Sequence, residues 1–319
     1  MASGKMDSTR ETTTDKMPSP IEENLELKEI DTNLYSNTKQ LWTPMGARGI
    51  FGGAVIAQAL SAAQKTVSPE YVVHSLHSYF LLPGDNSHPI IYHVERVRDG
   101  RSYATRTVQA QQRGRAIFTI TCSFQRPEPS TMSHNTPIPP DLPDPETLMN
   151  DSDLLQAMVD ADKLSERERK GLIKRMEPGP IESRRVPFRR WNKDLEPYQK
   201  RQRFWVKARG SIEAQTSHAM ALAYFSDSWF VGTSVKVNEP IEGKVVMMAS
   251  LDHSVYFHIR DWRADEWLLY EMESSWSGGG RGFASGKIWR RDGVLVASCF
   301  QEGLVRVDNL KGNKRDAKI

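Results

Sequence analysis

The chain has few of the features that mark membrane, secreted or metal-binding proteins. It holds only two cysteines, Cys122 and Cys299, in 319 residues, too few for a disulfide scaffold. No CxxC or Cys/His spacing predicts zinc, so we expect no metal and no cofactor. No apolar run approaches the roughly 18 residues of a transmembrane helix, and the N-terminus lacks the apolar segment of a secretory signal. These absences favour a reducing compartment and no stable membrane insertion.

The charge balance is close to neutral. The chain carries 43 lysines and arginines against 40 aspartates and glutamates, which gives a formal net charge of +3. Domains that bind nucleic acid are usually far more basic, so we expect no nucleic acid partner. A local basic pocket for an anionic ligand is compatible with this balance.

Changes in composition divide the chain into five segments. The stretch "RPEPSTMSHNTPIPPDLPDPE" is proline-rich, cannot form the interior of a sheet and separates two patterned regions. The predicted segments are a disordered N-terminal arm (1–20), a first folded unit (21–126), a linker with short helices at 146–161 and 165–176 (127–198), a second folded unit (199–308) and a basic, mobile tail (309–319).

Each folded unit begins with a helix of small residues and continues as strands. The run Gly53–Gln64 predicts the first helix, and "TSHAMALAYFSD" predicts the second. Strands follow each helix and end at Gly-containing turns such as "RDGRS" and "QQRGR". A helix followed by antiparallel strands is an α+β unit, and two of them predict a pseudo-dimer with one joined sheet.

The two halves also resemble one another in sequence, which predicts an internal repeat. "HSLHSYF" aligns with "ASLDHSVYF", which places Ser75 over Ser250. "TITCSFQ" aligns with "VASCFQ", which places Gln125 over Gln301. The interval from serine to glutamine is nearly equal in the two halves. The alternative is that the strand-turn-strand patterns match by chance.

A carboxylate distinguishes the second half from the first. The second helix is followed by Asp227, whereas the first ends at Ala63 and Gln64. Asp227, a strand serine and a strand-end glutamine are polar groups on apolar elements, and together they can hold and activate a water molecule. The plainer interpretation is that Asp227 is an ordinary residue of a helix-end turn.

These segments resemble a known family. "FGGAVIAQAL", "HSLHSYFLLPGD", "VERVRDGRSYATRTVQA", "GPIESRRV", "AYFSDSWF", "SLDHSVYFH" and "GVLVASCFQEGLVRV" occur in order and are similar to the acyl-CoA thioesterase II family, bacterial thioesterase II and its peroxisomal relatives. The resemblance implies a double hotdog fold, in which each helix is wrapped by a curved antiparallel sheet. It also implies an enzyme that hydrolyses fatty acyl-CoA to free acid and CoA.

The resemblance carries three catalytic residues onto this chain. The aspartate of "SD" after the second helix is Asp227, the serine before "LDH" is Ser250, and the glutamine of "QEG" is Gln301. Asp252, inside "LDHS", is a candidate catalytic acid by type but does not fall on the family's catalytic position, so we expect it to be structural or supporting. His253 lies three residues after Ser250, an odd offset that predicts the opposite face of one continuous strand.

The reaction expected from this trio is attack of a held water on the thioester carbonyl, without an acyl-enzyme, because no histidine base is predicted beside Ser250. The developing oxyanion needs donors, and the glycine-rich start of the first helix, Gly52 and Gly53, is the predicted source. The same glycines could instead serve helix packing alone. No residues that contact CoA are predicted.

Two other functions stay open at this point. Hotdog folds also include enoyl-CoA hydratases, although the Asp/His pair typical of their active-site loop is not evident here. A non-catalytic acyl-CoA binding or sensor protein is the third reading, and the retained Asp227 disfavours it. In every case acyl-CoA is the expected ligand, and a homo-oligomer is left open.

The chain ends in Ala317, Lys318 and Ile319, a small–basic–aliphatic triplet. It is similar to the peroxisomal signal of the Ser-Lys-Leu type, from which it departs at its first and third positions. We therefore expect a peroxisomal import receptor as a partner and the peroxisomal matrix as the location. Without such import the protein would be cytoplasmic.

Overall fold

A computed structural model describes residues 17, 19–44, 46–160, 166, 169 and 179–308. The helices are α1 (Pro20–Asn24), α2 (Gly52–Gln64), α3 (Asp151–Asp160), α5 (Phe188–Asn192), α6 (Gln215–Ser226) and α7 (Thr233–Val237), with 3-10 turns at Pro145–Thr147 and Pro197–Gln199. The strands are β1 (Leu27–Asp31), β2 (Leu34–Asn37), β3 (Val72–Phe80), β4 (Ile91–Asp99), β5 (Tyr103–Gln112), β6 (Arg115–Gln125), β7 (Ile181–Arg185), β8 (Gln202–Ala208), β9 (Lys244–Ser250), β10 (Asp252–Phe257), β11 (Leu268–Gly278), β12 (Arg281–Arg290) and β13 (Leu295–Asp308).

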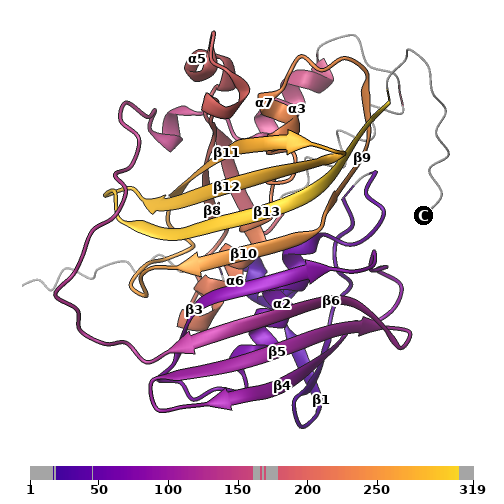
Figure 1. Ribbon diagram of the computed structural model, residues 1–319, viewed down its shortest axis with the longest axis vertical. Helices are drawn as coiled ribbons and strands as arrows, with labels where there is room; N and C mark the ends of the chain where they lie inside the picture. The colour runs from indigo at the N-terminus through magenta and orange to yellow at the C-terminus, as the bar shows by residue number, and fades with distance from the viewer. Residues whose placement is uncertain are drawn as a thin grey trace, which may run out of the picture.

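All of these strands form one sheet in which neighbours run antiparallel (Figure 1). The order along the sheet is β1-β2-β4-β5-β6-β3-β10-β13-β12-β11-β8-β7, and β9 pairs with β13 beside this path. Strands β3 and β10 pair at the centre, so the strands of the first half lie on one side of this junction and those of the second half on the other.

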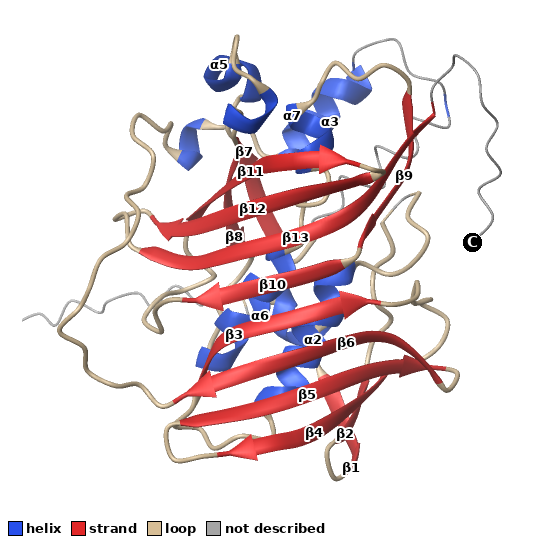
Figure 2. Ribbon diagram, in the orientation of Figure 1, coloured by secondary structure: helices blue, strands red, loops and turns tan. Residues whose placement is uncertain are grey.

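The long helices α2 and α6 lie together behind the middle of the sheet (Figure 2). Alanines and glycines let them approach closely: a β carbon on Gly53 would lie only 2.1 Å from the carbonyl oxygen of Tyr224 in α6. Nearly every residue of both helices is buried. Two small-residue helices wrapped by one curved antiparallel sheet confirm the predicted α+β double hotdog fold.

Several local predictions are wrong in detail. The segment "KVVMMASLDHSVYFHI" forms two strands, β9 and β10, because the chain leaves the ladder at Leu251. The predicted linker contributes β7, which pairs with β8 at an edge of the sheet. Prolines near an edge strand are tolerated because they interrupt no hydrogen bonds inside the sheet. Strands β1 and β2, which were not predicted from the sequence, lie inside the predicted first unit.

Other predictions fall partly or wholly outside the described residues. The first linker helix is confirmed only as α3. Of the second, predicted at 165–176, only residues 166 and 169 are described, both as helical, and the others lie outside the described part of the chain. The N-terminal arm to residue 16 and the basic tail from residue 309 also lie outside it. Among the described residues, no helix is long and apolar enough to cross a membrane.

The strand register also corrects the alignment of the two halves. Cys122 pairs with Leu76, and Cys299 pairs with Val255, so the two buried cysteines occupy matching places. Phe124, two residues after Cys122, is therefore the inward counterpart of Gln301, and Gln125 is not. The cause is the extra serine in "CSFQ", which shifts Gln125 to the other face.

The strand register corrects the serine alignment as well. Ser75 lies one residue before Leu76, as Ser254 lies one residue before Val255, so Ser75 matches Ser254 and not Ser250. The first half thus lacks both the carboxylate and the inward glutamine of the second. Whether the halves arose by duplication stays a prediction.

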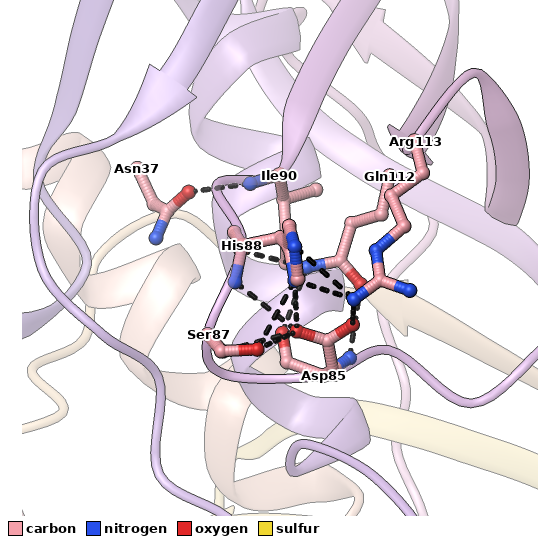
Figure 3. Close-up of polar contacts among 7 residues, drawn as sticks. All are labelled: Asn37, Asp85, Ser87, His88, Ile90, Gln112 and Arg113. Atoms are coloured by element: carbon pink, nitrogen blue, oxygen red, sulfur yellow. Dashed lines mark hydrogen bonds and ion pairs between the residues drawn. The ribbon is translucent and has the colours of Figure 1, made fainter.

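The loop after β3 fixes the chain that leads into α2. In this loop Asp85 pairs with His88 at 2.8 Å, and the Gln112 side chain donates to the backbone oxygens of both residues at 2.8 Å (Figure 3). The neighbouring Gly84 carbonyl accepts the Ile50 N–H at 3.0 Å. This polar cluster therefore supports the segment immediately before the first turn of α2.

Candidate active site

Asp227 lies between the two central helices. It is the residue that ends α6, with helical backbone angles, and it is only 9% exposed. Its carboxylate accepts hydrogen bonds from the Gln301 amide, the Ser250 hydroxyl and the backbone N–H of Gly53. The Gln301 contact, from Nε2 to Oδ1, is 2.7 Å long.

The surroundings of Asp227 raise its pKa. Burial away from water is the largest effect and disfavours the charged carboxylate, while the three hydrogen bonds partly offset it by stabilising that form. A carboxylate with a raised pKa is a stronger proton acceptor than an ordinary aspartate. Asp227 therefore has the chemistry of a general base.

Gln301 lies in β13 with its side chain turned inward, and it is 1% exposed. Its alternation with the buried Cys299 places it on the helix-facing side of the sheet. The amide oxygen Oε1 is buried and has no hydrogen-bond partner among the described residues. Buried polar atoms are usually paired, so this oxygen is an acceptor available to a bound molecule.

Ser250 ends β9, opposite Gly303 of β13, and is half-buried. The structure therefore brings together Asp227, Ser250 and Gln301, which are widely separated along the chain. The cluster spans three elements: the end of α6, the end of β9 and the middle of β13.

The two glycines predicted as an oxyanion site lie at the same place. Gly53 already donates its N–H to Asp227. A β carbon on Gly52 would lie 2.7 Å from Oδ2 of Asp227 and 2.8 Å from the Phe80 ring. The start of α2, from the first half, thus meets the end of α6, from the second half. These glycines therefore do two things: they allow α2 to pack closely against α6, and they lie beside the Asp227 carboxylate.

His253 is the residue that sequence reasoning misplaced. Because the chain breaks strand at Leu251, the odd offset from Ser250 does not put His253 on the opposite face. His253 is fully buried, and its Nδ1 lies 3.2 Å from Gln301 Nε2. Its Nε2 lies 2.8 Å from the Ser226 hydroxyl. His253 lies two residues before the buried Val255 in β10, so alternation within that strand predicts that both side chains face inward.

Burial lowers the pKa of His253 to about 3, so the imidazole is neutral at physiological pH.

Asp252, its neighbour, accepts the backbone N–H of Glu302 at 2.7 Å, which agrees with the predicted structural role. Among the described residues, no group of three or more histidines, cysteines or acids is arranged to hold a metal ion.

Comparison with known proteins identifies the family. The chain matches the acyl-CoA thioesterase N-terminal domain over residues 39–125 and the acyl-CoA thioesterase C-terminal domain over residues 153–305. It is 43% identical to acyl-coenzyme A thioesterase 8 of Mus musculus, over 89% of this chain and 88% of that protein. It is 28% identical to peroxisomal acyl-coenzyme A thioester hydrolase 1 of Saccharomyces cerevisiae, over 94% and 97%.

A solved structure agrees with these matches. The acyl-CoA thioesterase II TesB2 of Mycobacterium marinum is 35% identical and superposes with a TM-score of 0.71, covering 92% of this chain and 100% of that chain. The chain therefore belongs to the acyl-CoA thioesterase family, and specifically to its thioesterase II branch. It is an acyl-CoA thioesterase, a thioester hydrolase.

Proposed function

We propose that this thioesterase hydrolyses fatty acyl-CoA to the free acid and CoA with a water molecule held by Asp227, Ser250 and Gln301. The observation that carries the proposal is the buried carboxylate with an unpaired amide oxygen beside it. These two acceptors match the two hydrogens of one water. The enclosing helices and sheet keep other water away from them.

The proposed chemical step is direct attack of this water on the thioester. Asp227 removes one proton of the water while the water oxygen bonds to the thioester carbon. Gln301 Oε1 accepts the other hydrogen and sets the direction of attack. Ser250 donates to Asp227 and holds the carboxylate in place. When the tetrahedral intermediate breaks its carbon–sulfur bond, Asp227 returns the proton to the leaving CoA sulfur.

The oxyanion of that intermediate needs a hydrogen-bond donor. The N–H of Gly53 is already used by Asp227. We therefore assign the oxyanion donor to the N–H of Gly52, in the first turn of α2. This position carries the positive end of the helix dipole. Because Gly52 has no side chain, Asp227 Oδ2 and the Phe80 ring can lie against the start of α2; a β carbon on Gly52 would come within 3.0 Å of both.

Asp227→Asn tests the proposal. The variant keeps the shape of the side chain but cannot take the proton, so kcat should fall by about 10²- to 10⁴-fold. Release of CoA from saturated acyl-CoA is followed with a thiol reagent. Asp252→Asn is the matched control, since an asparagine oxygen can still accept the Glu302 N–H, and it should keep near-normal turnover. Full activity of a folded Asp227→Asn enzyme would rule out Asp227 as the base.

For the location, we propose import into the peroxisomal matrix through Ala317–Ile319 and an import receptor. The yeast relative is named peroxisomal, which supports this. A fluorescent fusion that ends in the native tail should enter peroxisomes, and deletion of the last three residues should leave it in the cytoplasm. Unchanged import after the deletion would refute the assignment. A homo-oligomer stays a prediction that gel filtration can test.

A further inference from the structure

His253 contacts the site without being a member of the proposed catalytic trio. Its two ring nitrogens meet two different groups: Nδ1 lies 3.2 Å from Gln301 Nε2, and Nε2 lies 2.8 Å from the Ser226 hydroxyl. The ring also meets Phe230 edge to face, with centroids 5.6 Å apart. A histidine held on all sides in this way has a fixed ring position.

The Ser226 side of the ring determines where the imidazole carries its hydrogen. The Ser226 hydroxyl lies 3.0 Å from the carbonyl oxygen of Ala223, which can only accept. When the single hydroxyl hydrogen goes to that carbonyl, Ser226 must accept a hydrogen from His253 Nε2. A neutral imidazole has one N–H, so Nδ1 then has a free lone pair facing Gln301.

The lone pair on Nδ1 in turn determines which end of the Gln301 amide faces it. An amide N–H can donate to this lone pair, whereas the amide oxygen would be repelled by it. The ionised Asp227 makes the same selection, because its Oδ1 lies 2.7 Å from Gln301 Nε2. The two amide hydrogens are thus used by His253 and Asp227, and the amide oxygen is left without a partner.

We propose, on the basis of the function proposed above, that His253 is a positioning residue that locks the Gln301 amide so that its oxygen faces the attacking water. Each hydrogen bond in this series sets the donor of the next. Ser226 donates to the Ala223 carbonyl and accepts from His253, and His253 accepts from Gln301. His253 itself does not touch the reacting atoms or exchange a proton in the reaction.

Two substitutions at this position separate the roles of the two ring nitrogens. In His253→Asn the side-chain oxygen can occupy the place of Nδ1 and still accept from Gln301. In His253→Gln the side-chain amide reaches the place of Nε2 and keeps Ser226, but nothing accepts from Gln301. We expect kcat to fall about 100-fold in His253→Gln, and by less than about fivefold in His253→Asn, with KM changed little in both. A purely structural role predicts equal losses, and equal losses would overturn the proposal.

A double variant tests whether His253 acts through Gln301. In the Gln301→Ala background, His253→Gln should lower kcat no further, because the amide it positions is gone. Losses that multiply would show that His253 acts independently and would overturn the proposal. His218→Gln is the control: His218 is buried in α6 and accepts the Ala264 N–H at 3.1 Å, far from Gln301 in the hydrogen-bond network, so it should lower stability and not kcat.

The wild-type enzyme gives a test that does not depend on any variant's folding or turnover. Nitrogen-15 NMR of histidine-labelled protein reports the tautomer, and the His253 signal is the one missing from either His253 variant or, if neither folds, the one with through-space contacts to Phe230. We expect a neutral ring with its hydrogen on Nε2 across neutral pH. A hydrogen on Nδ1 would overturn the positioning role of His253 even if Asp227→Asn confirms the proposed function. The positioning role and the proposed function can therefore fail separately.

Discussion

A methyl group at the start of α2 is the sharpest test of how closely the two helices pack. In Gly53→Ala the new carbon would lie 2.1 Å from the Tyr224 carbonyl oxygen and 2.6 Å from the Phe51 ring. Normal contacts between heavy atoms lie near about 3.5 Å, so the helices would have to separate by roughly 1 Å. Because the nearest atom belongs to the backbone of α6, side-chain rotation cannot relieve the clash.

The expected cost of Gly53→Ala is about 2–3 kcal/mol of unfolding free energy, the upper part of the range of about 1–3 kcal/mol that is usual for an overpacked core. For a protein of 319 residues, with an unfolding entropy of about 2 cal/mol/K per residue, Tm should fall by about 3–5 °C. Urea unfolding and thermal melts followed by circular dichroism measure both. A Gly53→Ala protein with wild-type stability would show that α2 and α6 do not meet as closely as described.

Gly52→Ala is the matched comparison. Its new carbon would meet Oδ2 of Asp227 at 2.7 Å and the Phe80 ring at 2.8 Å, and both are side-chain atoms that can move. We therefore expect a smaller loss of stability but a loss of kcat of about 100-fold, because the displaced carboxylate is the proposed base. Normal kcat in Gly52→Ala would contradict the contact between Gly52 and Asp227.

Four further predictions follow from buried groups. Because burial raises the pKa of Asp227, kcat should rise with pH through a midpoint above that of an ordinary aspartate; a flat profile would contradict its role as base. The raised pKa also means that folding favours the protonated carboxyl, so the unfolding free energy of wild type relative to Asp227→Asn should fall as pH rises through that pKa and level off above it, in urea titrations. Arg106→Ala should cost about 3 kcal/mol without changing kcat at low temperature, since this 1% exposed guanidinium donates to Thr66 and to backbone carbonyls; a stable variant would refute this. Cys122 and Cys299 are fully buried and burial raises the pKa of both thiols, so the native protein should not react with the thiol reagent of the CoA assay, whereas urea-unfolded protein should.

Much of the fold could be predicted from the sequence because its signals are local. The runs of small residues in α2 and α6 and the alternation in β4, β5 and β6 need no tertiary information. The edge strands β1 and β7, and β2 next to β1, are only four or five residues long and have weaker patterns. Their pairing depends on the rest of the sheet.

The candidate site was predictable in part. The sequence predicts Asp227, Ser250 and Gln301 as site residues. That they lie together depends on the packing of α6 against the sheet, which the sequence alone does not specify. His253 was misplaced because one residue outside the ladder, Leu251, reverses the strand parity. The single extra serine after Cys122 had the same effect on Gln125.

The central claim is that water, activated by Asp227, attacks the thioester directly. A single turnover with enzyme in excess over acyl-CoA, in water labelled with oxygen-18, tests it. The proposal predicts one labelled oxygen in the product acid, none in the protein, and no acyl-protein by mass spectrometry of the quenched reaction. Unlabelled acid with the label in Asp227, or an acyl group trapped on the protein, would contradict it.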